Sequence, residues 1–475
     1  MSDKSKVVVS NMIWKFAEKF GAQIISFIIS VILARILEIE DYSVVELLAV
    51  FLAIANVLVD SGLGNALIQK KDADSLDFST VLLFNIVWCS FLYILFFVSA
   101  PFIADFYNNK NLTSIFRFSG LIILISGVKN VQQAYVARMM QFKKFFFSTL
   151  GGTIISGIIG VILAISGYGA WALVAQNVIN AFVDTIILSI TVRWDFSFKF
   201  SLLRLKSLIF YGWKLLIASL LDTIYGNLSA LIIGKKYSAA DLAYYKKGNC
   251  WPSLVIININ YAIDSVLLPM MAKEQDEREK VKLLTRKSIQ MSSYIIWPMM
   301  IGLISVAEPL VRLVLTEKWL PIVPYMCVFA LCYAFYPIHT ANLNAIKALG
   351  RSDLILKLEV IKKIFGIVAI ISAMSHGVWT MMIAYAVTNV FSTVVNVWPN
   401  RRMIGYRVHE LIEDVVPSIL LSVIMGICSY SIQKLGLGDV VTIFIQVFVG
   451  VVVYVLGSIL GRFKIFFQLI GLLKK

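Results

Sequence analysis

The stretch FFFSTLGGTIISGIIGVILAISGYGAWALVAQNVINAFV, from Phe145 to Val183, runs for 39 residues without one charged side chain. A helix of about 20 apolar residues crosses the hydrocarbon core of a bilayer. The stretch therefore has the length of two crossings, and the turn SGYGAW at Ser166–Trp171 divides it. A second uncharged interval lies between Asp77 and Asp105. These runs predict a protein that crosses a membrane several times.

The composition of the whole chain shows the same bias. Only 15% of its 475 residues are charged and the mean hydropathy is +0.83, whereas soluble domains contain roughly 25% charged residues. No small-residue cleavage site follows the first apolar stretch, so we expect a retained helix and not a signal peptide. The five cysteines are odd in number and lie in or beside apolar segments, which predicts packing residues and no disulfide framework.

Apolar spans alternate with polar connections and predict an all-α membrane protein of about fourteen transmembrane helices. The first six are expected near 11–34, 42–68, 79–104, 113–136, 146–167 and 170–192. The other eight are expected near 208–234, 242–270, 288–315, 322–346, 355–375, 378–399, 414–433 and 439–461.

Lysine and arginine are distributed unevenly between the two predicted sides of the membrane. With the N-terminus inside, the cytoplasmic connections and tails hold 29 basic residues and the outer connections hold 8, out of 43 in the chain. Because basic residues are enriched in cytoplasmic loops, both termini are expected in the cytoplasm. The net charge of +15 follows mostly from this bias and does not indicate nucleic-acid binding.

The connections are too short to hold a catalytic domain. The longest of them, Lys273–Lys287, has only 15 residues, and the chain contains no GxxxxGK[ST] loop for nucleotide phosphates. We therefore predict that the chain is not an enzyme, uses no cofactor or metal, and takes any driving force from a proton or sodium gradient.

An internal repeat of about 200 residues is visible in the sequence. Leu33–Tyr42 aligns with Ile233–Leu242, with a basic residue six positions before an aspartate in both copies. Further on, Asp60–Asp72 parallels Asp264–Asp276. Such spacing is typical of transporters built from two copies of one helical bundle.

The repeat predicts the domain organisation. Residues 1–200 are expected to form an N-terminal six-helix bundle and 201–405 its C-terminal copy, with two further helices and a cytoplasmic tail in 406–475. Six is an even number, so both copies enter the membrane in the same direction. They should be related by a pseudo-two-fold axis along the membrane normal, with a central cavity between the halves that opens alternately to each side.

Four stretches carry a resemblance to a known family. They are GYGAWALVAQ (Gly167–Gln176), SALIIGKKYSAADLAYY (Ser229–Tyr245), AEPLVRLVLTEKWLPIVPYM (Ala307–Met326) and NAIKALGRSDLILKL (Asn344–Leu358). In these, and in order along essentially the whole chain, the sequence resembles the polysaccharide-repeat flippases of the MOP superfamily. It is closer to the Wzx-type lipid-linked oligosaccharide (O-antigen) flippases than to the multidrug extruders of that superfamily.

The resemblance implies a cargo and a location. It implies translocation of undecaprenyl-pyrophosphate-linked oligosaccharide repeat units across the bacterial inner membrane. The end product would be capsule, exopolysaccharide or the O-antigen of lipopolysaccharide. The expected partners are the lipid-linked substrate, membrane lipids, and the polysaccharide polymerase and chain-length machinery, with no nucleic acid.

Charged side chains within the predicted helices are candidates for substrate binding, because a charge at mid-bilayer costs at least about 2.5–3.5 kcal/mol and usually faces a cavity or a partner. Lys15, Glu18 and Lys19 share one face of the first helix and line either the inner mouth of the cavity or the membrane edge. Lys214 and Asp222 share one face of the seventh helix, two turns apart.

Three further lysines lie in apolar helices. Lys129 is too deep in its helix to reach the membrane surface easily. Lys246 and Lys247 follow two tyrosines and precede Trp251. In a cavity, an ammonium group would attract pyrophosphate or an acidic sugar, while the aromatic rings could stack on sugar rings. The alternative for the Lys246–Lys247 pair is a position at the outer membrane interface.

Four other ionisable residues are candidates for ion coupling or gating. Asp60 and Asp264 occupy equivalent places in the two repeats, near the inner ends of their helices. Asp184 is deep in its helix, where an interhelical salt bridge is an equal alternative. His339 would titrate near neutral pH if accessible, although a hydrogen-bonded buried histidine is the commoner case.

Two other functions are consistent with a helical membrane protein. A cation-coupled multidrug exporter would prefer an acidic cavity poor in lysine, and six lysines fall within the predicted spans here. A membrane polysaccharide polymerase or ligase would be expected to carry a large outer loop, whereas the outer connections here are about ten residues or fewer. The composition therefore favours a flippase.

Overall fold

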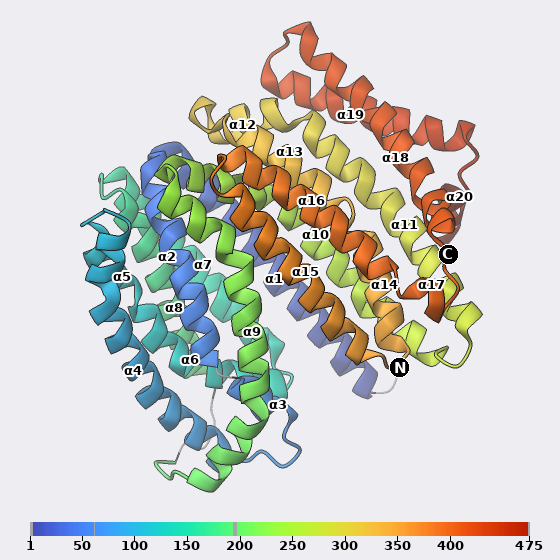
Figure 1. Cartoon of the computed structure of the whole chain (residues 1–475). Coiled ribbons are helices and arrows are strands. Elements are labelled where there is room, and N and C mark those ends of the chain that lie inside the picture. The colour runs from blue at the N-terminus through green and yellow to red at the C-terminus, as the bar shows by residue number, and fades with distance from the viewer. Residues whose placement is uncertain (1–2, 61, 193–196, 474–475) are drawn as a thin grey trace. The chain divides into compact units, whose positions relative to one another are not determined.

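The computed structural model describes residues 3–60, 62–192 and 197–473, and every regular element in that part of the chain is helical. The chain divides into two compact units, Met1–Ala243 and Tyr244–Lys475. Figure 1 shows the helices with their labels. Each unit is described here by itself.

The N-terminal unit contains nine complete helices in its described residues. They are α1 (Asp3–Ile36), α2 (Ile39–Asp60), α3 (Leu63–Gln69), α4 (Ser75–Phe106), α5 (Leu112–Ser119), α6 (Leu121–Arg138), α7 (Phe142–Ile165), α8 (Ala170–Thr191) and α9 (Leu202–Lys236).

The C-terminal unit begins within α10. Its α-helices are α10 (Ala239–Lys273), α11 (Arg278–Ser305), α12 (Ala307–Leu315), α13 (Ile322–Tyr333), α14 (Tyr336–Ala348), α15 (Ser352–Ala373), α16 (Val378–Val397), α17 (Asn400–Met403), α18 (Val408–Ser431), α19 (Asp439–Leu460) and α20 (Lys464–Leu473). Two 3₁₀ turns lie at Glu317–Trp319 (η1) and Ile432–Leu435 (η2).

The described residues include twelve helices long and apolar enough to cross a membrane, and a thirteenth span where α11 and α12 meet at a bend of 64°. This confirms the all-α membrane class. The count is one below the fourteen predicted, because the span expected at 355–375 is only partly apolar. That segment folds as α15, which carries five charged residues among its first twelve, including Lys357, Glu359 and Lys362.

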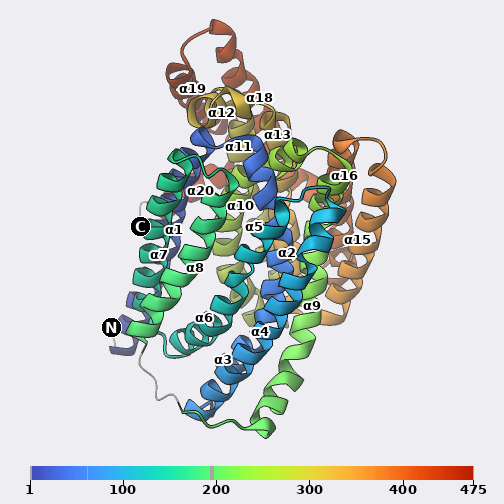
Figure 2. The ribbon, with the colours of Figure 1, turned by 90° about the vertical axis from the view of Figure 1, so that its left-hand side faces the viewer.

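The uncharged stretch Phe145–Val183 folds as predicted into two helices joined by a tight turn. α7 and α8 pack side by side along their length (Figure 2). Gly169, just before α8, has a φ of 53°, and Gly377, just before α16, has a φ of 105°. Both values favour glycine. This explains why similar turn motifs, SGYGAW at Ser166–Trp171 and SHGVW at Ser375–Trp379, occur in the two halves of the sequence.

Matching aspartates open α2 and α10 in the same way. The Asp41 carboxylate accepts a hydrogen bond from the backbone N–H of Glu38 at 3.2 Å, and Asp241 accepts one from Ser238 at 3.1 Å. Asp41 also accepts from the N–H of Ala170 at 2.8 Å, at the start of α8. Since a carboxylate satisfies free N–H groups and favours the positive end of a helix dipole, the repeated aspartate directs helix starts.

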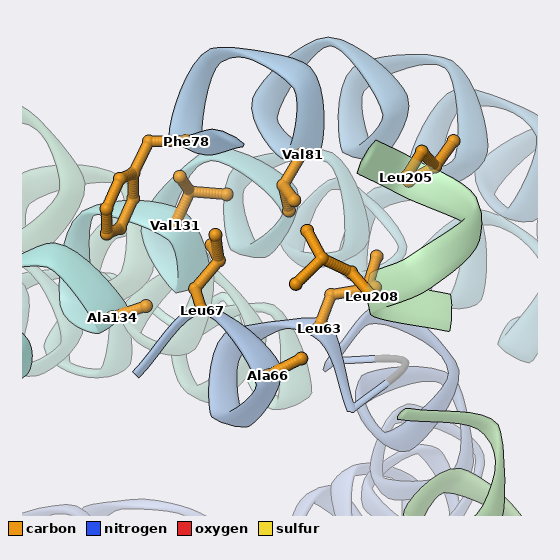
Figure 3. Packing of buried hydrophobic residues seen from close by; sticks show 9 residues of the cluster. All are labelled: Leu63, Ala66, Leu67, Phe78, Val81, Val131, Ala134, Leu205 and Leu208. Atoms are coloured by element: carbon orange, nitrogen blue, oxygen red, sulfur yellow. The ribbon is translucent and has the colours of Figure 1, made fainter. Parts of the chain in front are cut away.

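Helix α9 packs with the N-terminal unit, although the repeat groups it with residues 201–405. Leu205 and Leu208 of α9 are buried against Leu63 and Leu67 of α3 (Figure 3). The compact unit therefore extends to Ala243. The domain boundaries drawn from the repeat remain a prediction, since a repeat records sequence similarity and a compact unit records packing.

A glycine at the break between α2 and α3 allows α9 to approach. Gly62 has a φ of +68°, and a Cβ atom there would lie 2.5 Å from the carbonyl oxygen of Gly212 in α9. The backbone conformation and the lack of space both require glycine at this position. Helix α2 ends at Asp60, so this break places Asp60 at a helix end within the N-terminal unit.

The two helices after the repeat are anchored to α11. Tyr454 of α19 donates a hydrogen bond to the carbonyl oxygen of Tyr294 at 2.7 Å. Arg286 of α11 holds both carboxylate oxygens of Asp414 in α18, at 2.8 and 2.9 Å. Such a bidentate contact fixes direction as well as distance, so α18 and α19 are held firmly on the C-terminal unit.

Candidate functional site

Each unit contains a cavity lined by polar residues from several of its helices. The cavity of the N-terminal unit, called here the N-terminal pocket, has a volume of about 370 Å³. It is lined by residues of α1, α2, α3, α6 and α7, namely Lys15, Glu18, Asp60, Gly64, Asn65, Ile68, Asn130, Gln133, Ala134, Ala137, Phe142 and Phe145.

Charged groups of α1 line one side of the N-terminal pocket. The Lys15 ammonium lies 5.3 Å from the centroid of the Phe142 ring, within the range of a cation–π contact. Glu18 accepts a hydrogen bond from the Thr149 hydroxyl at 3.2 Å. The predicted α1 face thus contributes one cation and one carboxylate to the cavity. Asp60 lines the same cavity from the end of α2.

A buried ion pair joins α6 to α8 in the same unit. The Lys129 ammonium lies 2.6 Å from the Asp184 carboxylate, whose side chain is only 4% exposed. Opposite charges that pair in an apolar environment offset part of the cost of burying each one. The pair realises the salt-bridge alternative predicted for Asp184 and gives Lys129 a partner. Asn130, the next residue along α6, lines the N-terminal pocket.

The C-terminal unit contains a cavity of about 410 Å³, called here the asparagine pocket. Four asparagines and one histidine dominate its wall. It is lined by residues of α10, α14, α15 and α16, namely Asn260, Asp264, Tyr336, His339, Thr340, Leu343, Asn344, Lys347, Lys362, Asn389, Ser392 and Asn396.

Hydrogen bonds between helices hold the wall of the asparagine pocket. Asn344 donates to the Asp264 carboxylate at 2.8 Å. The two ring nitrogens of His339 lie 2.7 Å from the Asn396 amide nitrogen and 2.9 Å from the Thr393 hydroxyl. Both nitrogens are therefore occupied, as expected for the hydrogen-bonded buried histidine that the sequence left as the alternative.

The two pockets collect five of the predicted site residues. Lys15, Glu18 and Asp60 line the N-terminal pocket, while Asp264 and His339 line the asparagine pocket. The repeat-equivalent aspartates thus have equivalent positions, one at each cavity. Their roles in binding, coupling or gating remain predictions.

The other predicted residues lie elsewhere. Lys246 and Lys247 are half-buried in the second turn of α10, where the Lys247 ammonium is 5.7 Å from the Trp319 ring. Lys19 and Asp222 are exposed in their unit and are not among the residues that line the two pockets. The side chain of Lys214 lies outside the described residues.

Most of the amide side chains that line the pockets are not among the residues predicted from the sequence. Asn130 and Gln133 are three residues apart on α6, and Asn389 and Asn396 are seven apart on α16. Each spacing places two amides on one face of a helix. Paired amides in an otherwise apolar helix were the available signal, because a polar group in such a helix needs a partner or a cavity.

A charged cluster between α3 and α4 lies outside the predicted spans and the pockets. Arg204 of α9 contacts the Asp74 carboxylate, and Lys70 lies 2.7 Å from Asp77, which is fully buried. The hydrogen bond from Arg204 lowers the pKa of Asp74 to about 2. These contacts fasten the start of α9 to the N-terminal unit.

Residues 32–324 match the model of a protein family described as polysaccharide biosynthesis protein. The chain belongs to this family. This match confirms the resemblance to membrane proteins of polysaccharide biosynthesis that the sequence motifs indicated. The protein is a multi-pass membrane protein of polysaccharide biosynthesis.

Two characterised bacterial proteins are similar along most of the chain. The teichuronic acid biosynthesis protein TuaB of Bacillus subtilis is 24% identical over 446 residues, covering 91% of this chain and 90% of TuaB. The succinoglycan biosynthesis transport protein ExoT of Rhizobium meliloti is 24% identical over 340 residues, covering 70% of this chain and 69% of ExoT.

Solved structures share the fold. The lipid II flippase MurJ, in an inward closed conformation, superposes with a TM-score of 0.74 at 16% identity, covering 95% of this chain and 99% of MurJ. An inward-facing multidrug transporter of the MATE family superposes with a TM-score of 0.61 at 13% identity, covering 81% of this chain and 94% of that one. The fold is therefore that of the MOP superfamily.

Proposed function

We propose that the protein moves undecaprenyl-pyrophosphate-linked oligosaccharide repeat units across the bacterial inner membrane for surface polysaccharide biosynthesis. The transport would proceed by alternating access, with both termini in the cytoplasm. The family membership supports the pathway, and the name of ExoT supports a transport role in particular. The observation that carries the proposal is the presence, in each apolar helical unit, of a cavity lined by charged and amide side chains.

The cargo has a charged part that the N-terminal pocket suits. A pyrophosphate carries negative charge and several acceptor oxygens, so it is bound best by ammonium groups and amide N–H donors. Such donors come from three helices, at Lys15, Asn65, Asn130 and Gln133. The carboxylates of Glu18 and Asp60 line the same cavity, so bound protons or cations would neutralise them when the pyrophosphate enters. Phe142 and Phe145 supply an apolar border next to them. This combination fits a headgroup whose lipid chain remains in the membrane.

A gradient of protons or sodium ions is the driving force that we propose. The carboxylates of Asp60 and Asp264, which line the two pockets, would act as coupling groups. Asp184 is less suited to this role, because Lys129 already neutralises it at 2.6 Å. A polymerase and chain-length proteins at the outer face would then use the translocated units.

The test is flipping itself. The purified protein would be reconstituted in liposomes with undecaprenyl-pyrophosphate-linked repeat units, and accessibility of the glycan from the far leaflet would be followed with and without an ion gradient. Lys15→Ala would be compared with Lys110→Ala, an exposed lysine between α4 and α5. We expect flipping by the wild type and by Lys110→Ala, with a clear loss in Lys15→Ala.

Two results would contradict the proposal. Absence of flipping by a correctly folded wild-type protein would refute it. Export of a lipophilic cation from the same liposomes would instead assign the protein to the multidrug branch whose fold it shares.

A further inference from the structure

We propose that the asparagine pocket is a saccharide subsite, which binds one hydroxyl-rich glycosyl ring of the cargo. This inference rests on the proposed function and specifies which part of the molecule recognises the sugar. The pocket wall contains acceptor oxygens that lack hydrogen-bond partners among the described residues.

Three asparagines of the pocket wall carry an unsatisfied amide oxygen. The Oδ1 atoms of Asn344, Asn389 and Asn396 are enclosed and have no hydrogen-bond partner among the described residues. Asn344 is 0% exposed and Asn396 is 1% exposed. A buried polar group without a partner destabilises the fold, and an occupant that supplies donors would satisfy these three oxygens together, because all three asparagines line one cavity.

For Asn344 the hydrogen-bond network makes this shortage independent of how the amide is oriented. Asn344 must present its nitrogen to the Asp264 carboxylate, which only accepts, and this leaves its oxygen without a donor. Asn396 has its amide nitrogen 2.7 Å from Nδ1 of His339, and its oxygen has no donor among the described residues. The terminal torsion of asparagine is soft, so a small rotation would turn the free atom to a ligand.

The pocket also presents donors and an aromatic ring. The ammonium groups of Lys347 and Lys362 line it, and Lys362 contacts Glu359 at 2.5 Å on its other side. The ring of Tyr336 lies in the same wall, 5.8 Å from that of His339. Sugar hydroxyls both donate and accept, so they match a wall that mixes amide oxygens with lysine donors.

The size and charge of the pocket favour a sugar over a bare cation. A volume of about 410 Å³ lies within the roughly 300–1,000 Å³ typical of small-molecule pockets. The lining includes two lysines and one carboxylate, Asp264, and Glu359 pairs with Lys362, so the pocket has no excess of negative charge that would select a cation. An apolar drug would leave the asparagine amides unsatisfied. A polyhydroxylated ring satisfies each of these conditions.

The experiment separates binding of the glycan from binding of the lipid pyrophosphate. Two probes would be titrated onto the purified, full-length protein in nanodiscs: bare undecaprenyl pyrophosphate, and the lipid-linked repeat unit isolated from cells that lack the transporter. The primary variant is Asn389→Ala, whose side-chain oxygen has no hydrogen-bond partner among the described residues. The matched control is Asn258→Ala, an asparagine of α10 that does not line the asparagine pocket and donates to the carbonyl oxygen of Leu254 in its own helix at 2.9 Å.

We expect the wild type and Asn258→Ala to bind the glycan-bearing probe more tightly than the bare one. Asn389→Ala should lose about three- to tenfold in affinity for the glycan-bearing probe, the effect of one net hydrogen bond, and keep its affinity for the bare probe. Asn344→Ala, with its melting temperature measured alongside, tests a second wall position.

Three results would overturn the inference. One is an unchanged preference for glycan in both variants, and another is equal binding of the two probes by the wild type while flipping persists. A third is sodium binding that disappears in Asn389→Ala while the glycan preference is unaltered, which would make the pocket a cation site. If the wild type binds neither probe, the proposed function itself fails.

Discussion

The N-terminal pocket and the asparagine pocket show how two related units diverge in chemistry. Each is lined by the repeat-equivalent aspartate, Asp60 in one and Asp264 in the other. Around Asp60 the wall carries one lysine, one glutamate, three amides and two phenylalanines, whereas around Asp264 it carries two lysines, four asparagines and a histidine. A shared position of one carboxylate therefore does not imply a shared ligand. We propose that the first wall binds the pyrophosphate through Lys15 and its amides, and that the second binds a sugar through its four asparagines.

The largest effect is expected from the buried ion pair of the N-terminal unit. Lys129→Ala leaves Asp184, 4% exposed, without its partner, which should lower the free energy of unfolding by about 3–5 kcal/mol. The ion pair that Lys362 of the asparagine pocket forms with Glu359 should contribute less to the free energy of unfolding. Lys362→Ala leaves Glu359, which is 40% exposed, and should cost no more than about 1 kcal/mol.

Thermal unfolding of both variants in detergent measures this difference. The double variant Lys129→Met/Asp184→Leu is the control, since removing both charges should restore much of the lost stability. Equal losses in Lys129→Ala and Lys362→Ala would contradict the contrast between the two units.

The second effect concerns the break beside Asp60. Gly62→Ala places a Cβ 2.5 Å from the Gly212 oxygen at a positive φ, so α9 must shift or the backbone must change. We expect a loss of about 1–3 kcal/mol in unfolding free energy, together with impaired flipping. Gly226→Ala of α9 has open space around it and should be neutral or slightly stabilising. Wild-type stability of Gly62→Ala would show that the break tolerates a side chain.

A third effect separates the ligands of the two pockets. Lys15→Ala should weaken binding of bare and glycan-bearing lipid pyrophosphate alike, by about tenfold or more, because it removes a charge-assisted hydrogen bond. Asn389→Ala should weaken only the glycan-bearing probe. Titration of both variants with both probes tests the comparison directly. The same pattern in both variants would mean that the two pockets do not divide the cargo between them.

The smallest effect is a pH dependence in the charged cluster at α9. Arg204 lowers the folded-state pKa of Asp74 to about 2, below the ordinary value near 3.9. The pair therefore stabilises the fold above about pH 4 and loses that contribution as the pH falls towards 2. Because the Asp74 side chain is 53% exposed, the contribution should stay below about 1 kcal/mol.

Asp74→Asn is the variant that isolates this charge, since asparagine also caps a helix N-terminus. Its melting temperature should lie slightly below that of the wild type at pH 6, and the difference should vanish towards pH 2. A difference that is constant with pH would assign the effect to the cap at α4 and not to the ion pair.

Much of the fold was predictable because its signals are local. Hydropathy alone predicts twelve spans, and the single stretch Phe145–Val183 predicts the pair of uncharged helices. The aspartates Asp41 and Asp241 indicate helix starts through contacts three residues away. α15 is the exception among the predicted spans, because its charges are visible in the sequence but their effect on a crossing depends on the neighbouring helices.

The candidate site was predictable only in part. Intramembrane charge pointed to Lys15, Asp60 and Asp264, which do line cavities, and equally to Lys246 and Lys247, which are not among the residues that line the two pockets. The free-energy cost of burying a charged side chain indicates that the residue needs a partner or a cavity, but it does not identify which one. The asparagines give a weaker sequence signal, because burying an amide costs less free energy than burying a charge, and an amide in an apolar helix therefore indicates a cavity less strongly.

The sequence by itself determined the class of the protein, the order of its crossings and the family to which it belongs, since hydropathy, turn glycines and motifs are properties of short segments. Only the tertiary structure decided that Lys129 meets Asp184, that α9 packs against α3, and that asparagines from α10, α14 and α16 share one cavity. Those contacts join helices through residues at least 45 positions apart. They depend on the rotation and depth at which each helix packs against the next, which no single helix encodes.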